Sequence, residues 1–191
     1  AKVAGKDVAL VRVSFAGELG WEVHCDRGDA AAIYESLLAG GAVPFGMKAL
    51  NAMRIEKGYR AWMGDLSTDY SLLEGGLERF IDWSRDFPGK AALLAEKQRG
   101  VKKRFVSLKV EACECDAPYM STLWHQGQVV GETTSGAWGY RVGHSMALGM
   151  LRVDLAVAGT EVEVEIFGDR VKAVVLPDGP AWDAKNERIR A

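Results

Sequence analysis

The sequence predicts an α+β fold in which about 100 residues of mixed helix and strand precede a small all-β domain. Patterns with the period of a helix occur only in the first part of the chain, whereas alternating patterns dominate after Gly100. No helical pattern of useful length occurs between residues 102 and 176, and its short strands with frequent turn signals are typical of a small barrel or sandwich. The composition, 48% apolar and 26% charged, excludes a disordered protein and a disulfide-dense miniprotein.

The first 100 residues are predicted to contain two strands followed by helices. Apolar and polar residues alternate over residues 8–25, on both sides of a loop in which Gly17 and Gly20 permit a tight turn. Asp29 is a favourable N-cap for the helix that follows it, and Gly40 stands at the end of that helix. The predicted helices cover residues 29–39, 48–57 and 90–99, with Ile33, Leu37 and Leu38 on one face of the first and Leu50 and Met53 facing inward in the second.

The chain after Gly100 is predicted to be all-β, with Gly168-Asp169 as a two-residue hairpin turn. The predicted strands are residues 106–110, 128–134, 145–152, 161–167 and 171–175. The charged segment that follows Pro177 is expected to be a loose tail. We therefore divide the chain into an α+β part (residues 1–100), a barrel (residues 101–178) and a tail (residues 179–191), with the basic run at 102–104 as the boundary.

Charge and hydropathy exclude several partners. The chain has 24 basic and 26 acidic residues, and a net charge of −2 gives no general attraction to nucleic acid or to an anionic membrane. No apolar run approaches the roughly 20 residues that cross a bilayer. The three cysteines, Cys25, Cys113 and Cys115, are an odd number and are expected to be reduced thiols of a cytoplasmic protein. Because the chain begins with Ala1 rather than Met, we expect it to be a piece of a longer polypeptide.

The common catalytic and metal-binding motifs are not found in the sequence. The glycine that a P-loop requires is replaced by Ser84, and no Gly-x-Gly-x-x-Gly or Gly-x-Ser-x-Gly motif is present. The spacing Cys113-Glu114-Cys115 is too short for a zinc knuckle, and the three histidines are scattered. We therefore assign neither a catalytic residue nor a metal ligand.

Two charged residues are candidates for ligand binding. Glu22 follows Trp21 on a predicted strand whose other face looks buried, and its carboxylate can accept two hydrogen bonds side by side, as the amide–amine edge of a heterocycle requires. Arg54 lies one turn after Leu50 on a predicted helix, where an arginine commonly anchors a carboxylate or pairs with a neighbour such as Glu56. The residue pattern alone favours the ordinary roles, a solvent-facing strand residue and a simple ion pair.

A series of short motifs resembles the glycine-cleavage T-protein (aminomethyltransferase) family. The motifs follow one another in the family's order over nearly the whole chain, and this order makes the resemblance specific. They are residues 12–22, 53–60, 64–65, 72–77, 87–93, 131–136, 147–149 and 159–166. The amino-acid sequences of residues 54–60 and 139–143 are most similar to the folate-binding region of dimethylglycine and sarcosine dehydrogenases.

The resemblance implies that tetrahydrofolate binds between the α+β part and the barrel and receives a one-carbon unit from an amine. It implies that Glu22 grips the 2-amino and N3 edge of the pterin, and that Arg54 lines the same site. The family's catalytic aspartate lies upstream of where this chain begins. The family often has tyrosine at the position of Met150, and methionine cannot donate the tyrosine's hydrogen bond.

The resemblance leaves two functions open. In the first, the chain is the C-terminal part of a tetrahydrofolate-dependent aminomethyltransferase, inactive without the missing N-terminal half of the same polypeptide. In the second, it is a non-catalytic folate- or substrate-binding module of an FAD-dependent dimethylglycine or sarcosine dehydrogenase, with FAD held by an upstream domain. In both, the expected partners are folate and a small amine.

Overall fold

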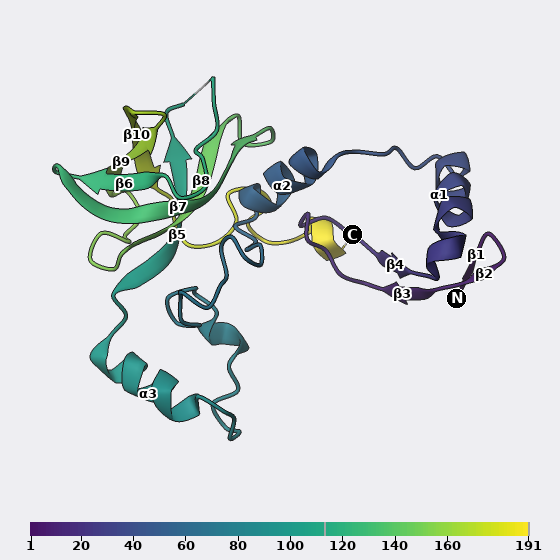
Figure 1. Cartoon of the computed structure of the whole chain (residues 1–191), viewed down its shortest axis with the longest axis horizontal. Coiled ribbons are helices and arrows are strands. Elements are labelled where there is room, and N and C mark those ends of the chain that lie inside the picture. The colour runs from purple at the N-terminus through teal and green to yellow at the C-terminus, as the bar shows by residue number, and fades with distance from the viewer. Residues whose placement is uncertain (113, 191) are drawn as a thin grey trace.

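The computed structural model describes residues 1–112 and 114–190, so Cys113 of the Cys-x-Cys pair lies outside the described residues. All helices longer than one turn in this part of the chain precede a closed six-stranded barrel, which confirms the predicted α+β class and selects a barrel over a sandwich (Figure 1). Among the described residues, no helix has both the length and the apolar character needed to cross a membrane.

The N-terminal part consists of small hairpins and separate helices. Strand β3 (Ala9–Val11) pairs antiparallel with β4 (Glu22–His24), and the intervening loop is longer than predicted because both strands are short. The remaining elements are β1 (Lys2–Val3), β2 (Lys6–Asp7), α1 (Ala30–Ala39), α2 (Met47–Glu56) and α3 (Lys90–Arg99), with single 3₁₀ turns at Arg27–Asp29 and Glu78–Phe80.

The three predicted helices are confirmed to within one residue, but their buried faces are not. In α1 only Ile33 is buried, whereas Leu37 and Leu38 are exposed. In α2, Leu50 and Met53 are only half-buried, and the most buried side chains lie in the last two turns. The reason is that the C-terminal half of α2 packs against the barrel, so contact with the barrel decides which side is covered.

The barrel strands run in the order β10-β5-β8-β7-β6-β9, and every neighbouring pair is antiparallel. They are β5 (Lys103–Val110), β6 (Thr122–His125), β7 (Gln128–Gly139), β8 (His144–Arg152), β9 (Glu161–Ile166) and β10 (Asp169–Val175). Strand β6 was not predicted because four residues are too few to establish an alternation. The β9–β10 turn is Phe167-Gly168, one residue earlier than predicted, since Ile166 already pairs with Asp169.

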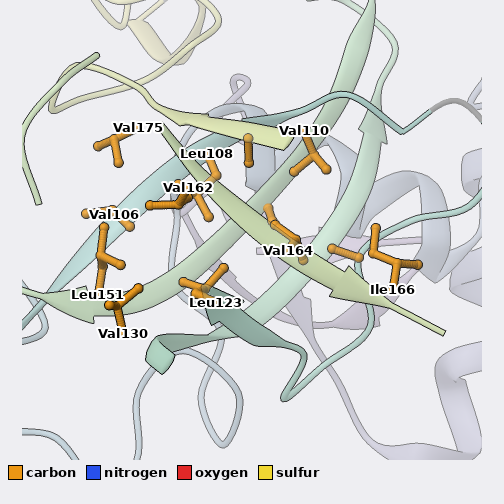
Figure 2. Close-up of a cluster of buried hydrophobic side chains, with 13 residues drawn as sticks. Val106, Leu108, Val110, Leu123, Val130, Leu151, Val162, Val164, Ile166 and Val175 are labelled. Carbon is orange, nitrogen blue, oxygen red and sulfur yellow. The ribbon is translucent and has the colours of Figure 1, made fainter. Parts of the chain in front are cut away.

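Aliphatic side chains from all six strands fill the barrel (Figure 2). A second cluster joins α2 to the outside of the barrel through Ala52, Ile55, Phe105, Ala137, Met146, Leu148 and Met150. Met150 is fully buried in this second cluster. Its side chain therefore serves the packing of the α2–barrel interface.

The C-terminal segment, expected to be loose, is held against α2 (Figure 1). The main-chain N–H groups of Ala181 and Trp182 donate to the carbonyl of Glu56 over 2.9 and 3.0 Å. The carboxylate of Asp183 lies 3.0 Å from the buried ammonium of Lys57. The end of a helix leaves carbonyls without partners, and a buried ammonium requires a counter-ion. The C-terminal segment supplies N–H donors for the first need and a carboxylate for the second.

Gly136 in β7 lies so close to another part of the chain that a side chain does not fit. A Cβ atom at this position would lie 2.2 Å from the carbonyl oxygen of Ala117. We predict that Gly136→Ala destabilises the protein by about 1–3 kcal/mol, because the backbone must shift to relieve the overlap. Gly28→Ala, where a Cβ atom meets nothing within 4 Å, is the matched control in a urea-unfolding comparison. Equal stability of the two variants would contradict the close approach.

Candidate functional site

Arg54 lies at the centre of a buried polar network between α2 and β7. Its side chain is 3% exposed and donates to four groups. The acceptors are Asn51 Oδ1 at 2.8 Å, the Tyr59 carbonyl at 3.0 Å, Asp65 Oδ2 at 2.5 Å and Ser135 Oγ at 2.6 Å. Burial lowers the pKa of the guanidinium, and the charge of Asp65 opposes that shift. The arginine remains charged because its base strength is so high.

Asp65 is fully buried and is the other half of this network. Besides Arg54, its carboxylate accepts from the Ala61 N–H at 2.8 Å, from Thr134 Oγ1 at 2.5 Å and from Ser135 Oγ at 2.9 Å. The network thus joins three of the sequence motifs, residues 53–60, 64–65 and 131–136, into one structural unit. Asp65 belongs to the sequence motif at residues 64–65, but the residue pattern did not predict a role for it.

The residue pattern suggested Glu56 as an ion-pair partner of Arg54, and this prediction was wrong, because Arg54 pairs with Asp65. Glu56 points to the other side of the helix, where its carboxylate accepts from the Arg141 N–H at 2.7 Å. The ring of Phe15 lies over the Arg54 guanidinium at 5.9 Å. Four of the five N–H donors of Arg54 are already used, so one donor and this partly covered face remain for the predicted contact with folate.

Glu22 is placed very differently. It begins β4 opposite Val11, and its side chain is 60% exposed. Its carboxylate lies 3.1 Å from His24 Nε2, two residues along on the same face of the strand. Trp21 is 57% exposed, so the expectation of a buried opposite face was wrong for this chain. The carboxylate is consequently accessible to a ligand.

No hydrogen bond or ion pair among the described residues joins Glu22 to Arg54. The connection between them is the loop after β3, whose Phe15 reaches Arg54 and whose Trp21 precedes Glu22. Phe15 and Trp21 are both exposed, and exposed aromatic rings are suited to stack on a flat heterocycle. Both rings belong to the sequence motif at residues 12–22, but the residue pattern did not predict that they belong to the site.

A third polar group lies between the loop before α3 and the barrel. Tyr70 donates from its hydroxyl to Glu132 Oε1 at 3.0 Å, and Lys103 Nζ lies 2.7 Å from the same oxygen. Burial and the neighbouring carboxylate raise the pKa of Tyr70. Of these three residues, Glu132 is the one that belongs to a sequence motif, at residues 131–136.

An α+β part that is joined to a closed barrel through a buried arginine–aspartate network defines the class of protein. Residues 1–85 match the model of the GCVT N-terminal domain, and residues 103–183 match that of the glycine cleavage T-protein C-terminal barrel domain. The chain belongs to the glycine-cleavage T-protein (aminomethyltransferase) family.

The relatives include both dehydrogenases and aminomethyltransferases. The chain is 38% identical over 183 residues to a mitochondrial dimethylglycine dehydrogenase of Rattus norvegicus, an alignment that covers 93% of this chain and 21% of the relative. It is 33% identical over 174 residues to an aminomethyltransferase of Thermosynechococcus vestitus, covering 91% and 47% respectively. A crystal structure of glycine cleavage system aminomethyltransferase T from Bartonella henselae superposes with a TM-score of 0.82 at 26% identity, over 93% of this chain and 50% of that one. The chain thus spans about half the length of the aminomethyltransferases and a fifth of the dehydrogenase.

We predict that Asp65→Asn destabilises the protein by about 3–5 kcal/mol, because it leaves the buried Arg54 charge without compensation. Asp154→Asn removes the partner of Arg152 from a solvent-exposed pair, and little or no loss of stability is expected there. Urea unfolding of both variants measures the difference. Similar losses at the two positions would show that the buried network is not a main source of stability.

Proposed function

We propose that this chain forms the folate-facing C-terminal part of an enzyme that transfers a one-carbon unit from a small amine to tetrahydrofolate. Membership of the aminomethyltransferase family supports the reaction class. The observation that carries the proposal is the accessible carboxylate of Glu22, with the exposed rings of Trp21 and Phe15 in the same loop–strand segment.

In the proposed complex, Glu22 accepts two hydrogen bonds from the amino group and ring N–H of the pterin. A carboxylate fits this edge because it offers two acceptor oxygens side by side and no donor. Phe15 and Trp21 would contact the faces of the ring system. Arg54 is a positioning residue in this complex. Its hydrogen bonds fix the 53–65 segment, and its guanidinium contacts the ring of Phe15.

We further propose that the rest of the site, including the group that moves the proton during transfer, comes from polypeptide that longer relatives have and this chain does not span. Two facts support this. The chain covers about half of the aminomethyltransferases, and apolar side chains stay exposed on β3, on the loop that follows it and on α1. Exposed apolar groups of this extent are typical of contact surfaces.

Nothing in the described part of the chain favours the alternative of a non-catalytic module, since Met150, the one departure that pointed to it, takes part in packing. FAD enters the proposal only as the cofactor of an upstream domain in a dehydrogenase-like parent. The cytoplasmic location stays a prediction, since the animal dehydrogenase relatives are mitochondrial by name.

Glu22→Gln is predicted to weaken folate binding at least about tenfold, because it removes a charge-assisted hydrogen bond and turns an amide donor toward a pterin donor. Calorimetric titration would use a polypeptide that joins this chain to the N-terminal half of an aminomethyltransferase. Glu35→Gln, the same change at an exposed position of α1, is the control. Melting temperatures should not change in either variant. Equal folate affinity in the wild type and Glu22→Gln would contradict the role of Glu22.

The chain by itself is predicted to show negligible aminomethyl transfer and negligible oxidation of sarcosine or dimethylglycine. The reason is that the sequence offers no candidate for the catalytic acid–base group. The measurement is turnover of these amines by the purified chain with tetrahydrofolate and with an electron acceptor. Turnover above a buffer control would show that this chain carries the catalytic group itself.

A further inference from the structure

A cavity of about 210 Å³ lies away from Glu22 and Arg54, where four segments of the chain meet. The segments are residues 57–60 after α2, residues 76–79 before the 3₁₀ turn and within it, residues 104–107 of β5, and residues 177–180 after β10. Neither Glu22, Arg54 nor Phe15 lines it. The cavity is therefore separate from the proposed folate site.

The charges around this cavity are unbalanced. Lys57, Arg60, Arg79 and Arg104 line it, against the single carboxylate of Asp178. Lys57 is neutralised by Asp183 at 3.0 Å, and Arg104 lies 3.3 Å from Asp178 in an exposed pair. Among the described residues, no ion pair includes Arg60 or Arg79. Two arginine side chains at the cavity thus take part in no ion pair of the described residues.

Arg60 is held in one orientation by its surroundings. Its guanidinium lies over the ring of Phe105 at 4.0 Å, and Nη1 donates to the Gly58 carbonyl at 3.3 Å. Gly76 makes room for it, because a Cβ atom there would lie 2.8 Å from Nη2. The Nε–H of Arg60 is buried and has no hydrogen-bond partner in the described part of the chain. A buried donor without a partner is costly, and a bound acceptor would remove the cost.

Electrostatics also favour an anion at this place. Burial, followed by repulsion from Arg79, lowers the pKa of Arg60 to about 10, and attraction from Asp65 and Asp178 only partly opposes this shift. The guanidinium is still charged at neutral pH, and its repulsion with Arg79 is relieved when a negative group lies between them. The planar fork of an arginine matches two oxygens of a carboxylate or a phosphate.

We propose that this cavity is a binding site for a small oxyanion, a phosphate or carboxylate group, held by Arg60 and Arg79. Arg60 supplies a fixed fork, and Arg79, whose side chain is exposed, supplies a second charge at the mouth. Arg104 is the third cation of the site. It belongs to the basic run at 102–104, so this run contributes to a ligand site as well as to the boundary between the two parts of the chain.

Titration calorimetry of the intact chain tests this proposal, with inorganic phosphate and with glutarate as separate probes. Sodium chloride keeps the ionic strength equal in all arms, because general screening would otherwise resemble binding. We expect saturable binding of at least one probe. Binding of phosphate alone identifies a phosphate site, and binding of glutarate alone identifies a carboxylate site.

Arg60→Gln and Arg79→Gln should each weaken the binding at least tenfold. Arg79 is exposed, so its variant keeps the test valid if Arg60→Gln fails to fold. Arg85→Gln is the control, because Arg85 is an exposed arginine outside the cavity and pairs with Asp82. Absence of saturable binding of both probes, or binding that persists unchanged in Arg79→Gln, would overturn the proposal. Because neither probe is a folate, the result does not depend on the proposed function.

Discussion

The buried ion pair between Arg54 and Asp65 is the interaction on which the rest of the structure depends. It lies where α2, the loop that follows it and β7 meet, and its two side chains form hydrogen bonds with groups of the loop and of β7. Removing two charges from water is expensive, so such a pair persists only when further hydrogen bonds complete it. The hydroxyls of Thr134 and Ser135 provide that completion from the barrel side. The network therefore determines how the N-terminal part is seated on the barrel.

The two candidate ligand residues illustrate a division between positioning and binding. Arg54 is buried, and nearly all its donors serve the fold, whereas the carboxylate of Glu22 is exposed and, among the described residues, has His24 as its one hydrogen-bond partner. A residue that contacts a ligand must keep hydrogen-bonding capacity that the fold does not use. Glu22 meets that condition, whereas the role that we propose for Arg54 is to hold the segment that contacts Phe15.

The C-terminal segment combines structural and electrostatic tasks. By satisfying the Glu56 carbonyl and the Lys57 ammonium, it completes the end of α2. The same segment brings Asp178 to the cationic cavity, where it is the only carboxylate among the described residues that line it. Arg60, stacked on Phe105 at the barrel surface, takes part in no ion pair of the described residues. The distribution of charge around α2 is thus uneven, with a neutralised lysine beside two arginines that have no ion-pair partner in this part of the chain.

The sequence by itself determined the element types, the helix limits and the family. Local patterns carry this information: helix periods and glycine stops predicted α1, α2 and α3, and alternation predicted five of the six barrel strands. It also selected Glu22 and Arg54 as candidates, because the motifs around them are contiguous in the chain. Strand β6 was not predicted, because an alternation of apolar and polar residues cannot be recognised over only four residues.

Only the tertiary structure decided which partner each charged group has and which faces are buried. Asp65 is 11 residues from Arg54, and Ser135 is 81 residues away, so no local period could pair them. The exposure of Leu37 and Leu38 likewise depends on what packs against α1. The docking of the C-terminal segment depends on unsatisfied groups at the end of a distant helix. Hydrogen bonds and burial are properties of neighbours in space, and the closing of the chain on itself supplies those neighbours.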